Sequence, residues 1–89
     1  MSKSVKNTVI QFPELFLEPL LLLLERKGIK WCGYNGVTYA VKAGSDWENN
    51  GQIAIWFSRE DTFYFTGGVV GMDGVTEVSL NDLMERLGP

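Results

Sequence analysis

Histidine is absent from the 89 residues of this chain, and cysteine occurs once, as Cys32. The missing histidine excludes imidazole-based proton transfer and His-ligated zinc, and one cysteine cannot form an intramolecular disulfide. Three prolines and ten glycines are too few for a low-complexity chain, whereas 12% aromatic residues are too many for a disordered one. We therefore expect a folded domain that uses neither a metal nor another cofactor.

No apolar segment is long enough to suggest a membrane helix. The longest, Leu15 to Leu24, contains Glu18 and Pro19 and is about half of the roughly 20 residues that a bilayer span needs. The basic start, residues 1–6, is not followed by the apolar run and cleavage site of a secretory signal. Together with the single cysteine, this predicts a cytoplasmic location.

The length of the chain limits the number of its domains, and its charge distribution indicates the kind of partner it binds. We expect one domain over residues 1–89, because a chain this short has no room for two cores. The formal net charge is −3; residues 1–42 carry six Lys/Arg and three Asp/Glu, and residues 43–89 carry two and eight. The acidic second half favours a protein partner with a basic surface and argues against a nucleic-acid binder.

Two helices are predicted, one towards each end of the chain. Pro13 suits a first helical position, and the segment to Lys27 ends before Gly28, which can take a left-handed cap. Because Pro19 would interrupt a helix, we expect the regular part at about residues 18–27. Near the other terminus Ser79 suits an N-cap, and the following apolar positions have helical spacing: Leu80, Leu83, Met84 and Leu87.

The segment between these helices has the pattern of two β-hairpins. Asn35-Gly36 favours a two-residue turn that pairs Tyr34 with Val37, Cys32 with Tyr39 and Trp31 with Ala40. A second hairpin is expected over residues 52–57 and 62–66. In that hairpin we predict a left-handed Asp61 in the loop, with Phe57 opposite Phe63 and Ile55 opposite Phe65.

These elements predict an α+β fold. Its antiparallel sheet has four or five strands, built from the two hairpins, and the N-terminal and C-terminal helices pack on one face. Residues 1–11 are expected to be a frayed start that ends as a short edge strand, and residues 67–75 a glycine-rich bend or bulged edge strand.

Three aromatic side chains are assigned to the sheet face away from the helices: Trp31, Trp56 and Tyr64. Cross-strand pairing explains such a set, because aromatic residues have high strand propensity. The alternative is a surface that contacts a partner. We predict that these residues belong to a partner-binding surface.

The polar loop that begins at Asp46 carries a second candidate. Its oxygen-bearing side chains and Gly51 match the first part of an EF-hand calcium loop, but Phe57 stands where the bidentate carboxylate is required. Trp47 either folds back over the sheet edge or anchors a partner, with Asp46 and Glu48 as an acidic rim. We include all three residues in the predicted partner-binding surface.

The leucine run is apolar around the whole helix, whereas a helix lying on a sheet needs only an apolar stripe. Either other parts of the chain cover its back or a second copy does. We predict a homodimer in which Leu20, Leu21 and Leu24 form the self-association surface. The lone Cys32 is expected to be a small buried hydrophobe rather than a nucleophile.

Two functions from different classes remain open. The first is a small, acidic, non-catalytic protein-interaction module, by analogy an inhibitor or regulator of the kind made by phages and mobile elements. The second is a small carboxylate-dependent hydrolase or ligand-binding domain. It requires side chains from Glu48, Glu60, Asp61 or Asp73 to converge in a pocket lined by Tyr34, Tyr39 or Trp56.

Overall fold

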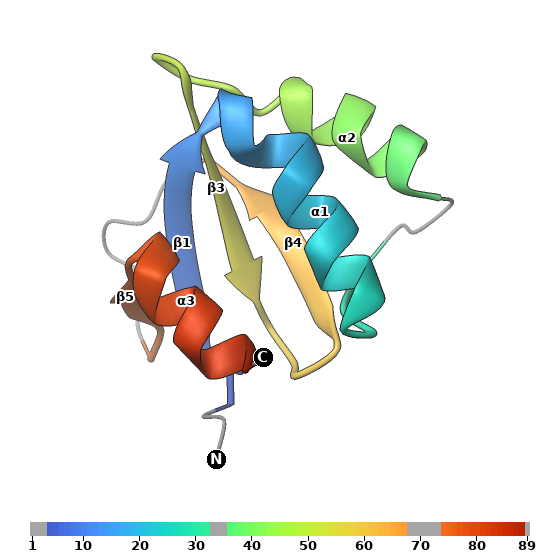
Figure 1. Ribbon diagram of the computed structural model, residues 1–89. Coiled ribbons are helices and arrows are strands. Elements are labelled where there is room, and N and C mark those ends of the chain that lie inside the picture. The colour runs from blue at the N-terminus through green and yellow to red at the C-terminus, as the bar shows by residue number, and fades with distance from the viewer. Residues whose placement is uncertain (1–3, 33–35, 68–73, 89) are drawn as a thin grey trace.

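The computed structural model describes residues 4–32, 36–67 and 74–88, and in these ranges five strands and three α-helices follow one another (Figure 1). Their order is β1 (Thr8–Pro13), the 3-10 turn η1 (Glu14–Phe16), α1 (Leu17–Arg26), β2 (Lys30–Trp31), α2 (Val37–Ser45), β3 (Gln52–Phe57), β4 (Thr62–Thr66), β5 (Thr76–Val78) and α3 (Leu80–Leu87).

The five strands form one mixed sheet in the order β2-β4-β3-β1-β5. The pairs β1–β3 and β3–β4 are antiparallel, whereas β1–β5 and β2–β4 are parallel. The prediction of an α+β fold is confirmed, but that of a purely antiparallel sheet is wrong. Parallel neighbours cannot be joined by a tight turn, and the chain between β2 and β4 contains α2 and β3.

The hairpin of β3 and β4 has the predicted register. Phe57 pairs with Phe63 and Ile55 with Phe65, so their side chains share one face of the sheet. Asp61, however, does not have the positive φ expected in the loop. The aromatic and β-branched alternation sets this register without help from the loop residue.

Strand β1 lies inside the sheet, between β3 and β5, and corrects the expectation of a frayed edge. Val9, Ile10 and Phe12 are almost fully buried in this strand, which has a neighbour on each side. Pro13 is the last strand residue, opposite Gln52, and not the first residue of a helix. At the end of a strand its missing N–H costs no ladder hydrogen bond.

Helix α1 tolerates Pro19 because the proline lies in its first turn, where backbone N–H groups have no partner within the helix. The expected end of the helix is confirmed. Gly28 has φ +80°, and the N–H groups of Gly28 and Ile29 donate to the carbonyls of Glu25 (3.0 Å) and Leu24 (2.8 Å). This is a Schellman motif, which allows the chain to leave the helix towards β2.

Helix α2 occupies the segment predicted to form the second strand of the first hairpin, so that prediction is wrong. Val37, Ala40, Val41 and Gly44 follow helical spacing, and Ala40 and Gly44 are buried. A two-residue turn with positive φ does occur, but at the other Asn-Gly pair, Asn50-Gly51, with φ +56° and +78°. Tyr34 and Asn35 lie outside the described residues, as do residues 68–73 of the predicted glycine-rich bend.

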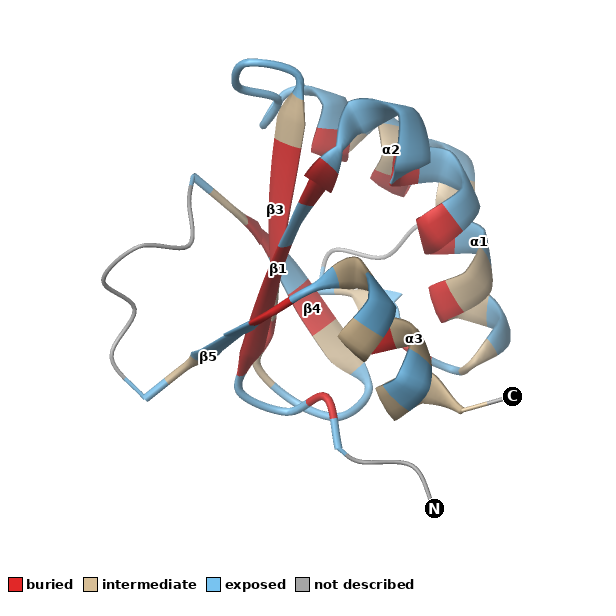
Figure 2. Ribbon diagram, turned by 60° about the vertical axis from the view of Figure 1, so that its left-hand side comes forward, coloured by how far each residue is buried: buried red, intermediate tan, exposed pale blue. Residues whose placement is uncertain are grey.

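Helix α3 begins as predicted, with the Ser79 hydroxyl accepting a hydrogen bond from the Asp82 N–H (3.0 Å). Figure 2 shows all three helices on the same side of the sheet. The core lies between the helices and this face, where Ile10, Ile55 and Phe57 meet buried residues of the helices. The fully buried side chains from these helices include Leu24 of α1 and Leu83 of α3.

Candidate protein-interaction surface

Two aromatic side chains and one carboxylate surround a hollow where α2 crosses the end of the edge strand β2. Trp31 of β2 and Tyr39, Lys42 and Ala43 of α2 line it together with Asp46, and its volume is about 180 Å³. We call these five residues, with the neighbouring Trp47 and Glu48, the aromatic edge. Its hollow combines two aromatic rings with one acidic and one basic side chain, those of Asp46 and Lys42.

Trp31 has this position because β2 runs parallel to β4. Its Cα partner is Phe63, so the indole lies on the same face of the sheet as the Phe63 and Phe65 rings and the helices. The Trp31 ring lies 5.7 Å from the Phe65 ring and stacks on Tyr39 at 6.0 Å with an interplanar angle of 29°. Trp31 is half-buried, whereas Tyr39 is 52% exposed. The predicted placement of Trp31 on the helix-free face is therefore wrong.

The acidic segment after α2 is held by backbone hydrogen bonds that continue the helical turn. The N–H of Asp46 donates to the Ala43 carbonyl (3.2 Å), and that of Trp47 donates to the Gly44 carbonyl (2.9 Å). Glu48 accepts a hydrogen bond from the Gly51 N–H, which ties its carboxylate to the adjoining turn. All three predicted residues are exposed, and Trp47 is 47% exposed.

The other two predicted aromatics, Trp56 and Tyr64, lie on the helix-free face and are separate from the aromatic edge. They are opposite each other on β3 and β4, with ring centroids 5.5 Å apart. Tyr64 is 40% exposed and Trp56 is half-buried. The Trp56 Nε1 atom is buried without a hydrogen-bond partner among the described residues. The stacking fits the alternative of cross-strand pairing, so the predicted surface divides into two parts.

Leu20, Leu21 and Leu24, the residues predicted for self-association, pack inside the protomer core. Each keeps at most 4% of its surface exposed. The exposed apolar side chains of this region are instead Leu15, Phe16 and Leu22.

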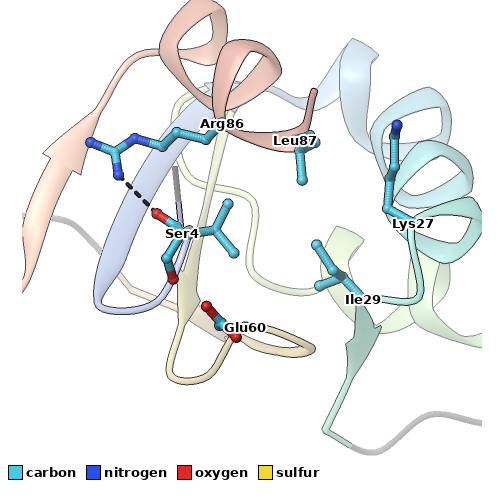
Figure 3. A pocket seen from close by; sticks show the side chains of 7 residues that line it. Ser4, Lys27, Ile29, Glu60, Arg86 and Leu87 are labelled. Carbon is cyan, nitrogen blue, oxygen red and sulfur yellow. Dashed lines mark hydrogen bonds between the residues drawn. The ribbon is translucent and has the colours of Figure 1, made fainter. Parts of the chain in front are cut away.

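A different hollow, of about 290 Å³, lies where α1 and α3 end beside the β3–β4 turn (Figure 3). Val5, Ile29 and Leu87 form its apolar wall. The Arg86 side chain extends away from the centre and donates to the Ser4 carbonyl (2.9 Å). Arg86 also forms an ion pair with Asp82 (3.3 Å), so its guanidinium group already binds both Asp82 and the Ser4 carbonyl.

Basic side chains from both halves of the sequence gather at this end of the molecule. Lys6, Lys27 and Arg59 line an adjoining hollow of about 660 Å³ with Glu60 and Asp61. In this hollow, cations from the first half of the sequence therefore lie beside carboxylates from the second half.

Glu60 and Asp61, two of the carboxylates in the hydrolase hypothesis, line one hollow, but neither Tyr39 nor Trp56 lines it. Glu48 precedes β3 and Glu60 follows it, and a strand of six residues separates its ends by about 20 Å. Asp73 lies outside the described residues. In the described ranges, no three His, Cys, Asp or Glu side chains are placed to hold a metal ion.

Cys32 is exposed, in contrast to the expectation of a buried thiol. It follows the edge strand β2, which has only two residues.

For the residues that the structure describes, no helix has the length and apolarity needed to cross a bilayer.

Sequence reasoning missed Tyr39 and Lys42 as neighbours of Asp46 because it placed them on a strand. The signal that could have found them is the helical spacing of small residues, Ala40 and Gly44, on one face of the segment.

Comparison of the chain with protein-family models, curated proteins and solved structures gives no significant match. The functional argument therefore depends on the geometry of this molecule.

Proposed function

We propose that the protein is a non-catalytic interaction module that binds the basic surface of a partner protein through its aromatic edge. The observation that carries the proposal is the hollow where the stacked rings of Trp31 and Tyr39 lie beside Asp46. Two of these residues, Trp31 and Asp46, belong to the surface predicted from sequence. The proposal includes the analogy with inhibitors or regulators of phage type, which is drawn only from the small size and acidic charge of the protein.

An arginine side chain of the partner is the anchor that best fits this chemistry. A guanidinium group is flat, is attracted to aromatic ring faces and forms paired hydrogen bonds with a carboxylate. Tyr39 offers an exposed ring, and Asp46 supplies a carboxylate in the hollow, which Lys42 also lines. Trp47, the residue after Asp46 in the chain, adds exposed apolar surface of the residue type that contributes most at interfaces.

The chain offers a matched pair of tyrosines to test this proposal. Tyr39 and Tyr64 are each stacked on a tryptophan and each about half exposed, but only Tyr39 belongs to the aromatic edge. We would titrate the labelled protein with an acetylated Gly-Arg-Gly peptide and follow the indole N–H resonances by NMR. The resonance of Trp31 should move, and Tyr39→Ala should weaken binding about tenfold, as loss of a cation–π contact predicts.

Tyr64→Ala should leave the peptide affinity unchanged. A Gly-Lys-Gly peptide should bind more weakly, because lysine lacks the planar guanidinium group of arginine. Equal loss in the two tyrosine variants, or movement confined to the Trp56 resonance, would reject the aromatic edge as the binding site. Self-association stays a prediction, which sedimentation velocity of the wild-type chain tests directly.

A further inference from the structure

The hollow of the aromatic edge contains a positive charge that an arginine side chain alone does not match. Lys42 lines it together with Asp46, which is the C-cap of α2. An ammonium group repels a guanidinium group, so Lys42 should lower the affinity for an arginine that brings no negative charge of its own. The lysine therefore restricts what binds in this hollow.

The residues that α2 contributes to the hollow form one stripe of the helix. Tyr39, Lys42, Ala43 and Asp46 follow one another at helical spacing, and the Trp31 ring stacks on Tyr39. The Cβ atoms of Lys42 and Asp46, four residues apart, are separated by about 6 Å in a helix. The hollow has a volume of about 180 Å³, whereas pockets for drug-sized ligands begin at about 300 Å³. It is therefore sized for one residue of a partner.

Lys42 and Asp46 do not neutralise each other. Both belong to the part of the chain that the structure describes, and no ion pair joins them. On a helix, lysine N-terminal to a carboxylate is the weaker of the two orders for such a pair. Both side chains are exposed, so each can contact a ligand. At Asp46 the negative end of the helix dipole adds to the carboxylate, which makes this end of the hollow the one that attracts a cation.

The hollow thus presents one cation and one anion, with aromatic rings beside them. An arginine inside a chain is flanked by neutral amides, but an arginine at a C-terminus carries both a guanidinium group and its own α-carboxylate. We infer that the aromatic edge binds the C-terminal arginine of a partner protein, with the guanidinium at Asp46 and the α-carboxylate at Lys42. This inference rests on the proposed function, because it specifies which arginine the same site takes.

Other sources of the two charges fit less well. In an extended chain, side chains on the same side are two residues apart, so an internal arginine with an acidic neighbour must order two side chains instead of one. Free arginine carries an α-ammonium group, which brings a second positive charge close to Lys42. Capture of a C-terminal carboxylate is also an established mode of peptide recognition.

The test compares two peptides that differ only in the C-terminal group, acetyl-Gly-Arg with a free carboxylate and acetyl-Gly-Arg amide. Both carry the guanidinium, so movement of the Trp31 indole resonance with the amide reports on the proposed function. The ratio of the two affinities reports on the inference. We expect the free carboxylate to bind about fivefold more tightly, as one partly exposed ion pair predicts, and the ratio to fall as salt is raised.

Equal affinities of the two peptides would overturn the inference and leave the proposed function standing. If neither peptide moved the Trp31 resonance, the proposed function would be rejected and the inference with it.

Lys42→Gln should act in opposite directions on the two peptides. It should weaken the free carboxylate about fivefold and leave the amide unchanged or bound more tightly, because a repulsive charge is removed. The two affinities should then be equal. A merely structural role of Lys42 would weaken both peptides together. Lys30→Gln removes the same charge from an exposed residue next to Trp31 that does not line the hollow, and should keep the fivefold ratio. Circular dichroism checks that both variants are folded.

Two further ligands separate a C-terminal arginine from other sources of the same charges. Acetyl-Arg-Gly-Glu amide supplies an internal arginine with an acidic side chain on the same side, and free arginine supplies the amino acid alone. Both should bind more weakly than acetyl-Gly-Arg with its free carboxylate. Equal or tighter binding of either ligand would overturn the inference, as would a ratio that Lys42→Gln leaves unchanged.

Discussion

The two sides of α1 differ in how closely the neighbouring helix approaches. On the α2 side the contact is made by small buried residues, Ala40 and Gly44, and a Cβ atom at Gly44 would lie only 3.1 Å from the Leu17 side chain of α1. On the α3 side the facing residues are large, among them Leu23 and Met84, and a groove of about 240 Å³ remains. Small residues allow two helices to pack closely, whereas large side chains that do not interlock leave a groove between them.

The largest expected effect concerns how α3 is attached. Leu83 is fully buried and Met84 is half-buried in the groove wall. Leu83→Ala should lower the free energy of unfolding by about 3 kcal/mol, because it removes apolar contacts and leaves a cavity. Met84→Ala should cost about 1 kcal/mol, since its site already opens to solvent. Urea denaturation measures both, and equal losses would mean that α3 is not held mainly by Leu83.

A smaller effect is expected on the closed side. Gly44→Val should destabilise the protein by about 2 kcal/mol, because the new side chain overlaps the Phe65 ring and approaches Leu17. The ring has little room to move, since Phe63 and Trp31 both pack against it. Thr38→Val adds a valine at an exposed position of α2 and serves as the control. If both variants had wild-type stability in thermal denaturation, the close approach at Gly44 would be refuted.

The smallest effect concerns the start of α3. Ser79→Ala removes the side-chain acceptor for the Asp82 N–H and should cost about 1 kcal/mol. Asn81→Ala, at an exposed position of the same helix, should change stability much less. Hydrogen exchange of the α3 amides would show whether the loss is local. Faster exchange throughout the sheet, with α3 unchanged, would contradict a local capping role.

The β3–β4 hairpin and α3 could be predicted because their signals are local. The register of Phe57 with Phe63 follows from alternation within adjacent segments, and Ser79 caps a helix that begins at the next residue. The segment of α2 shows the opposite case. Its β-branched and aromatic residues favour a strand, but burial of Ala40 and Gly44 against the rest of the core outweighs that weak preference.

The candidate site was predicted only in part, for the same reason. The polar composition of the segment after α2 predicts an exposed loop, and the structure shows Asp46, Trp47 and Glu48 exposed. The position of Trp31 beside Asp46 depends on helix α2, whose spacing of small residues competes with a strand pattern, and on the parallel pairing of β2 with β4, which has no local signal. The apolar groove between α1 and α3 likewise joins residues about 60 positions apart in the sequence.

The sequence by itself determined the α+β class, the ends of α1 and α3, the β3–β4 register and the lack of histidine chemistry. These properties depend on residue type, capping and periodicity over a few neighbouring positions. Only the tertiary structure decided the strand order, the helical state of residues 37–45 and the leucines that face the core. Burial energy depends on which distant segments meet, and that outcome is not contained in any single segment.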